Sequence, residues 1–322
     1  MQRTGYVSLI PSGTQPGITS NLNLDVDGET IANSAIVPIG SDGSIVLYTN
    51  ASTHAIVDLA GWWTPSPGAT SAGRFQPVGP VRMLDTRPES RVDHDGPKPT
   101  AGSVTPVQVT GRLGLPSSGV SAVVLNVTIA EPESLGFVQA APAATLQPGA
   151  SSTLNVGRPG QVIAASTIVP VDAQGRIALY SQSSTHLIVD VAGWFTDASV
   201  APGTDGMFVP TTSAQSPRQL DTRPGSGLWS GPKPTAGQRF GLPASGQAIV
   251  GTITVVDTDG PGFVQLGPAA TMTNGATSNI NPTRAGETVA NAFIVPVGGP
   301  GIGVFTSVGT HVIIDVSGYM TS

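Results

Sequence analysis

The chain has 322 residues, a formal net charge of −6 and no cysteine. Only 11% of the residues are charged, whereas glycine and proline number 41 and 29. The lack of cysteine excludes a disulfide framework, and the negative charge without a basic patch argues against nucleic acid as a partner. No apolar run approaches the roughly 18 residues of a membrane span, so none is expected. Many short strands joined by tight turns fit this composition.

Five repeat units are predicted in chain order. Each opens on a glycine with an aromatic residue one or two positions later, as in GYVSLIP, GRFQPVG and GFVQAAP. Repetition of this kind indicates one supersecondary unit used several times. The units alternate between two types, B and A, with the boundaries 1–72 (B1), 73–135 (A1), 136–205 (B2), 206–261 (A2) and 262–322 (B3).

Each unit contains four or five short strand candidates bounded by Gly, Pro, Asn, Asp and Ser. In the third unit they are the stretches 136–142, 151–156, 165–171, 176–182 and 186–195. The pattern has period 2, and no helix of standard length is predicted. The sequence therefore predicts an all-β fold of five antiparallel units of about 60 residues.

Two arrangements of these units are open. One is a five-bladed propeller-like ring, which the unit size and strand number favour. The other is a row of tandem β-sandwiches, each made of one A and one B unit. Stacked units are expected to bury one continuous apolar seam. An odd number of alternating units would place two B units side by side in a ring, which argues against closure. Because the chain starts on a B unit, we expect either part of a larger protein or a complete five-unit assembly.

Several motifs in a fixed order carry a resemblance to a known family. They are RMLDTRP at 82–88, AVVLNVT at 122–128, GASSTLN at 149–155 and THLIVDVAGWF at 185–195. Together they resemble the tandem LDTR / DVxGYF-type repeat of actinobacterial secreted and cell-surface proteins, which often stands beside hydrolase or other extracellular domains. The resemblance covers nearly the whole chain, although GTITVVD in A2 departs from LNVTIAE in A1. It implies an extracellular or cell-surface location, with an export signal that this chain does not show.

The closing motif of each B unit repeats a histidine and an aspartate four positions apart. Four residues along a strand span about 13 Å, whereas a catalytic dyad needs about 3 Å. We therefore interpret both residue types as structural, and we expect each partly buried carboxylate to accept backbone N–H groups of a nearby turn. The pairs are His54 and Asp58, His186 and Asp190, and His311 and Asp315.

The A units repeat the stretch LDTRP. Asp85 and Arg87 share one face of a strand and lie about 6.6 Å apart, a distance that a long arginine side chain bridges. Asp221 and Arg223 have the same spacing. A half-buried Asp–Arg pair at a unit boundary is the structural interpretation. The alternative is a binding site in which Arg87 and Arg223 offer planar guanidinium groups to a sugar, carboxylate or phosphate.

Two further stretches are candidate sites. Trp229 lies in the loop PGSGLWSG, where it would either stack on a sugar ring or fold back as a lid on its own unit. In LDVDGET, Asp25, Asp27 and Glu29 surround a turn as in a calcium loop. The other B units do not repeat these acids, and the twelve-residue calcium pattern is incomplete. No metal and no other cofactor is expected.

The sequence contains no nucleotide-binding loop, zinc-protease motif or nucleophile elbow. We therefore expect a non-catalytic extracellular module for surface adhesion or for attachment to a glycan, a cell-wall polymer or other surface proteins. Two alternatives are open. One is a polysaccharide-active hydrolase with carboxylates across a propeller channel, and the other is a subunit of a surface assembly or self-assembly.

Overall fold

Strands, turns and loops make up the whole of the chain that the structure describes. This computed structural model describes residues 5–16, 19–211 and 217–322; residues 1–4, which begin the stretch inspected for an export signal, lie outside it. Nineteen strands and no helix occur in the described residues. The strands form five antiparallel sheets, so the predicted all-β class is confirmed.

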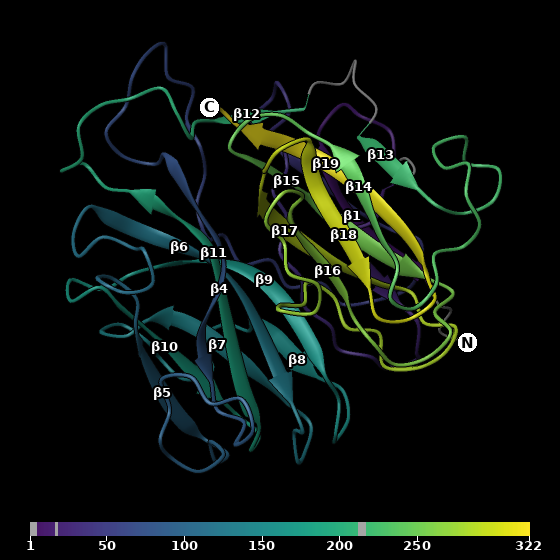
Figure 1. Ribbon diagram of the computed structural model, residues 1–322, viewed down its shortest axis with the longest axis horizontal. Coiled ribbons are helices and arrows are strands. Elements are labelled where there is room, and N and C mark those ends of the chain that lie inside the picture. Colours follow the sequence, from purple (N-terminus) through teal and green to yellow (C-terminus); the bar gives the residue numbers. More distant parts are fainter. Residues whose placement is uncertain (1–4, 17–18, 212–216) are drawn as a thin grey trace.

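The N-terminal unit (residues 1–72) contributes one small sheet, drawn in purple in Figure 1. Its strand order is β2-β1-β3. Two other stretches of this unit, 31–38 and 53–63, form no strand, although their copies in the later B units do. The bounds are β1 (Gly5–Pro11), β2 (Leu22–Leu24) and β3 (Ile45–Thr49).

The middle body (residues 73–205) consists of two sheets to which A1 and B2 both contribute. The first sheet has the order β4-β11-β6-β9 and the second the order β5-β10-β7-β8. In the first sheet, strands of A1 (β4, β6) alternate with strands of B2 (β11, β9), so neither unit can form it alone. The bounds are β4 (Phe75–Asp85), β5 (Ser103–Gln108), β6 (Val120–Ala130), β7 (Gly136–Pro142), β8 (Leu154–Val156), β9 (Ile163–Pro170), β10 (Arg176–Ser181) and β11 (His186–Thr196).

The C-terminal body (residues 206–322) repeats this arrangement with A2 and B3. Its larger sheet has the order β12-β19-β15-β17, and β13 pairs with β19 beside β12; the smaller sheet has the order β14-β18-β16. Strands of A2 and B3 again alternate in the larger sheet. The bounds are β12 (Phe208–Pro210), β13 (Arg218–Asp221), β14 (Arg239–Pro243), β15 (Ala248–Val256), β16 (Val264–Pro268), β17 (Val289–Pro296), β18 (Gly301–Thr306) and β19 (His311–Met320).

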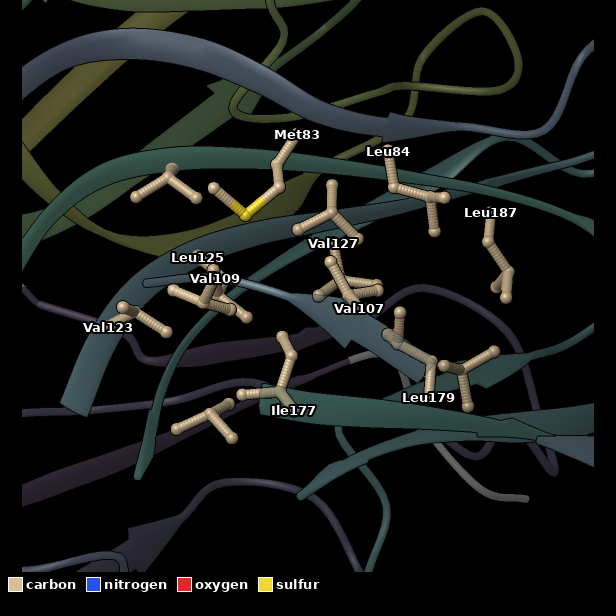
Figure 2. Close-up of a cluster of buried hydrophobic side chains, with 14 of the residues drawn as sticks. Met83, Leu84, Val107, Val109, Val123, Leu125, Val127, Ile177, Leu179 and Leu187 are labelled. Carbon is tan, nitrogen blue, oxygen red and sulfur yellow. The ribbon is translucent and has the colours of Figure 1, made fainter. Parts of the chain in front are cut away.

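The core of the middle body lies between its two sheets. Val107, Ile177 and Leu179 of one sheet belong to the same buried cluster as Leu125 and Leu187 of the other, and Figure 2 shows their side chains directed into a shared interior. All five are at most 1% exposed. Full burial of such a side chain stabilises the fold by about 1.5–3 kcal/mol, so the facing sheets hold each other in place.

The three B units meet at one junction through the same stretch of the repeat. Asn33 Oδ1 accepts the N–H of Ala292 at 3.0 Å, and Asn291 Oδ1 accepts the N–H of Ser166 at 3.1 Å. The Ser34 hydroxyl donates to the carbonyl oxygen of Ser166 at 2.7 Å. Equivalent positions of the repeat therefore contact one another. An apolar cluster at this junction includes one isoleucine from each copy, namely Ile36, Ile168 and Ile294.

The architecture differs from two expectations. Strand pairing closes no ring in the described part of the chain, so the five-bladed ring is not observed. The expected single apolar seam is also wrong, because the buried residues form one cluster in each body and a third at the junction. The physical reason is that an A unit and a B unit close a core between two shared sheets, so each body has its own core and the bodies meet through a separate apolar cluster.

Substitution of a glycine in the closing motif tests how closely the A and B units pack. A Cβ atom added at Gly193 would lie 2.3 Å from the ring of Phe75, whereas at the equivalent Gly61 nothing lies within 4 Å. We predict that Gly193→Ala lowers the free energy of unfolding by about 1–3 kcal/mol through overpacking. Gly61→Ala should change it by less than about 0.5 kcal/mol. Denaturant titration measures both, and equal losses would contradict the packing described.

Candidate functional site

Each body contains a buried aspartate that is held by an arginine of the neighbouring strand. Asp190 of β11 receives Arg82 Nε at 2.6 Å and Arg82 Nη2 at 3.2 Å. In the C-terminal body, Asp315 receives Arg218 Nε at 2.9 Å and Arg218 Nη2 at 3.0 Å. The donors are therefore forked arginine side chains and not the turn N–H groups that the sequence predicted. An arginine fork matches a carboxylate in a geometry that fixes both groups.

The LDTRP stretch continues this contact into a chain of charges. Asp85 receives Arg87 Nε at 3.0 Å, Arg87 Nη2 at 2.7 Å and Arg82 Nη1 at 2.8 Å. The predicted contact between Asp85 and Arg87 is thus present, and Arg82 links it to Asp190. The order Asp190–Arg82–Asp85–Arg87 places the two signs alternately, so each charge in the half-buried network has an opposite neighbour.

The same chain of charges is built in the C-terminal body. Asp221 receives Arg223 Nε at 2.9 Å and Arg223 Nη2 at 2.7 Å, as predicted. Arg218 Nη1 lies 3.3 Å from the Asp221 carboxylate and joins it to Asp315. Because two bodies with different loops reproduce these contacts, the network belongs to the repeat and not to one local site.

Burial and ion pairing act in opposite directions on these carboxyl groups. Burial raises the pKa of Asp190 and of Asp315, and the facing arginine opposes that rise. Burial also acts to raise the pKa of Asp85, but hydrogen bonds from Arg87 and the charge of Arg82 outweigh it, and the pKa lies below its ordinary value. The pKa of Asp221 is lowered for the same reasons. Asp85 and Asp221 are therefore the carboxylates that the folded state favours in the charged form.

The histidines contact the threonine of LDTRP. His186 Nδ1 lies 3.1 Å from Thr86 Oγ1, and Thr86 Oγ1 also accepts the N–H of Leu187 at 2.9 Å. In the C-terminal body, His311 Nδ1 lies 2.9 Å from the carbonyl oxygen of Thr222. The partners of these histidines thus come from the A unit, and the aspartate of the same motif is not among them. The threonine fixes the start of the closing strand against the A unit.

The third copy of the motif has a different environment. His54 and Asp58 lie in the exposed residues 53–62, and the stretch 53–63 forms no strand. The structure therefore brings together two of the three predicted sets of residues and leaves the set in the N-terminal unit apart. The motif alone does not create the network, because its arginine and threonine come from an A unit.

The network of the middle body also faces the C-terminal body. Arg82 Nη2 donates to the carbonyl oxygen of Ala276 at 3.2 Å, and Asn126 Nδ2 donates to that of Ser278 at 2.6 Å. The cavity beside Asp190 has a volume of about 20 Å³. This space has room for one water molecule and none for a sugar ring. The buried acid is therefore covered by the neighbouring body.

Trp229 folds back onto its own unit. Its ring centroid lies 5.1 Å from that of Phe240, and its Nε1 donates to the carbonyl oxygen of Pro232 at 2.9 Å. The side chain packs at the edge of the buried cluster of the C-terminal body. This is the arrangement expected of the lid alternative, in which the ring covers apolar side chains and its N–H is already bonded.

The stretch LDVDGET joins the N-terminal unit to the C-terminal body. The Asp25 carboxylate accepts the N–H of Thr288 at 2.7 Å and lies 3.6 Å from Arg284 Nη2. Glu29 accepts the N–H of Asp25 at 3.2 Å. In the described ranges, no cluster of three or more His, Asp or Glu side chains is placed to hold a metal ion. Asp25 and Glu29 of this stretch therefore contact backbone N–H groups and an arginine.

Arg82 and Arg218 are the functional residues that the sequence reasoning missed. Each stands three positions before the aspartate of LDTRP, in VRMLD and PRQLD. The repetition of an arginine at this position in both A units was the available indication. The pairing itself does not follow from local spacing, because the partner aspartates, Asp190 and Asp315, lie 108 and 97 residues further along the chain.

Comparison of the chain with protein-family models, with curated proteins and with solved structures finds no match. Across the residues that the structure covers, no helix has the length and apolar character to cross a membrane. The function has to be inferred from the chemistry of the chain's own residues.

The buried ion pair predicts a large difference between two equivalent aspartates. We predict that Asp190→Ala lowers the free energy of unfolding of the middle body by about 3 kcal/mol, because Arg82 loses its carboxylate in a half-buried place. Asp58→Ala, at the exposed equivalent position, should cost less than about 0.5 kcal/mol. Denaturant titration of the two variants distinguishes them. A stability of Asp190→Ala equal to that of wild type would contradict a structural role for the network.

The lowered pKa of Asp85 and Asp221 predicts sensitivity to acid. Because the folded-state pKa lies below the unfolded value of about 3.9, these carboxylates contribute stability that is complete above that value. The contribution is lost as the pH falls through the lower folded-state pKa. We predict that the double substitution of Asp85 and Asp221 by Asn lowers stability at neutral pH and reduces the further loss on acidification. Denaturation midpoints between pH 6 and pH 2 measure this, and parallel curves for variant and wild type would contradict it.

Proposed function

We propose that the protein is a non-catalytic structural and binding module of a bacterial cell surface. In this proposal the A and B units form a rigid scaffold, and loops of the A units contact a glycan or cell-wall polymer. The LDTR / DVxGYF-type resemblance supports an extracellular location. The observation that carries the proposal is that both bodies use the repeated Asp, Arg and His residues in the same contacts with one another and with the threonine of LDTRP.

The architecture that we infer is a set of tandem β-sandwiches, each made of one A and one B unit. The shared apolar cluster between the two sheets of the middle body supports this choice over a propeller. In a sandwich there is no central channel across which carboxylates of successive units could act. The hydrolase alternative depends on such a channel and is correspondingly less favoured.

Loops that differ between the A units are the candidate contact surface. Residues 89–96 and 225–231 follow the same LDTRP stretch but have unrelated sequences, ESRVDHDG against GSGLWSG. Loops on a rigid β framework are the usual place for binding. Leu228, which is 45% exposed beside the packed Trp229, offers apolar surface there.

A retention assay tests this proposal. We expect the purified chain to sediment with insoluble bacterial cell walls without releasing reducing sugar. Leu228→Ser should weaken retention about fivefold, which corresponds to about 1 kcal/mol, whereas Leu135→Ser, at an exposed leucine outside these loops, should not.

Two results would contradict the proposal. Release of reducing sugar that Asp190→Asn abolishes would favour the hydrolase alternative. Absence of retention on cell walls and on purified polysaccharides would favour the surface-assembly alternative.

A further inference from the structure

The N-terminal unit exposes residues whose copies are core residues elsewhere. Its closing stretch, residues 53–63, aligns with β11 and with β19, which are inner strands of their sheets. Val57 is 59% exposed, whereas the equivalent Val189 is 0% exposed. Leu59 is 79% exposed, and its equivalent Val191 is 0% exposed. The same apolar sequence is thus uncovered in one copy and fully covered in another.

The small sheet of this unit shows the same difference. Leu47 of β3 is 36% exposed, whereas the equivalent Leu179 of β10 lies in the core of the middle body at 0%. Strand β10 is flanked by β5 of the A unit, and among the described residues no strand pairs with β3 on that side. One face of the N-terminal unit is therefore apolar and exposed, although the equivalent face of the middle body is buried in a core.

Strand order identifies what covers this face in the other copies. In the middle body, β6 lies between β11 and β9, and β4 lies on the outer side of β11. The equivalents of β11 and β9 in the N-terminal unit are the stretches 53–63 and 31–38, which pair with no strand. Both strands that would complete the sheet belong to the A type. The open face thus lacks the two A-type strands that complete the equivalent sheet in the middle body.

We propose that this face is a docking site for a further A-type unit, which inserts its strands between and beside residues 31–38 and 53–63. The chemistry of the partner follows from the two complete bodies. It carries an arginine three positions before the aspartate of LDTR, which pairs with Asp58, and a threonine after that aspartate, which contacts His54. An aromatic residue near its start lies over Gly61, as Phe75 lies over Gly193 and Phe208 over Gly318.

The two A units of the same chain do not fill this role. Arg82 and Arg218 already pair with Asp190 and Asp315, and their strands lie within complete sheets. Asp58 has no ion pair with any residue that the structure describes, whereas the equivalent Asp190 and Asp315 each pair with an arginine. Charge and strand pairing both select an A-type unit additional to those two. Addition of strands to unpaired edges is an established mode of recognition, in which backbone bonds give affinity and alternate side chains give specificity.

The inference does not depend on the proposed attachment to glycans, because it concerns a different surface. A lack of retention on cell walls would not contradict the docking site, and a lack of docking would not contradict binding by the loops of the A units. The two proposals are therefore tested separately.

The experiment extends the chain with a second copy of residues 73–135, joined to Gly5. In the natural sequence Leu135 precedes Gly136, and Gly136 is the equivalent of Gly5, so the junction keeps the spacing of A1 and B2. Amide hydrogen exchange is measured on the extended and the unextended chain. We expect the amides of residues 54–61 to exchange rapidly in the unextended chain and at least about a hundredfold more slowly in the extended chain.

Matched substitutions show whether the contacts are those of the repeat. Asp58→Ala and, in the added copy alone, Arg82→Ala should each reduce the protection about tenfold or more. Gly61→Ala should leave the unextended chain unchanged and reduce protection in the extended chain, where an aromatic ring covers that position. Protection of β11 and β19 provides the internal control for folding of both bodies.

Three results would overturn the proposal. The first is an extended chain in which β11 and β19 are protected and residues 54–61 are not. The second is dimerisation of the unextended chain that protects residues 54–61, since the occupant would then be a second copy. The third applies where the extended chain does not fold. A fluorescent peptide with the sequence of residues 73–88 is then titrated onto the unextended chain and onto its Asp58→Ala variant. No binding of the peptide, or binding that Asp58→Ala leaves unchanged, contradicts the site.

Discussion

Alternation of A and B strands within one sheet is the constraint on which the rest of the structure depends. In the middle body β6 of A1 lies between β11 and β9 of B2, so the backbone hydrogen bonds of each unit are completed only by the other. A strand inside a sheet needs partners on both edges, because unpaired N–H and C=O groups are costly once buried. The working unit of this protein is therefore the A–B pair, and a single repeat unit is half of a fold.

The charge network follows from this alternation. Strand β4 places Arg82 beside Asp190 of β11, and the LDTR turn then brings Asp85 and Arg87 into the same chain of contacts. Taking these charges out of water costs free energy, which the ion pairs and hydrogen bonds offset. A shift of the strand register by one residue would turn Arg82 away from Asp190 and leave a buried charge unpaired. The network thus specifies which strands pair, and in which register, as well as contributing to stability.

Much of the local structure could be predicted from period and turn residues. The stretch 186–195 was expected as a strand and β11 spans His186–Thr196, and the contact between Asp85 and Arg87 follows from their spacing along a strand. The donors to Asp190 could not be predicted in the same way, because Arg82 is 108 residues away in sequence. The stretch 53–63 resembles its copies in sequence, yet it forms no strand, and no strand of an A unit is paired with it among the described residues.

The sequence by itself determined the β class, the alternation of two unit types and the residues that recur in each, since all three depend on side-chain period and on local turn chemistry. Only the tertiary structure decided that A and B units share their sheets, that Arg82 and Arg218 hold the buried aspartates, and that Trp229 covers its own unit. These features depend on contacts between residues far apart in the chain. The clearest example is Val57, which is apolar like Val189 and still 59% exposed, because burial is a property of the partner strands and not of the residue.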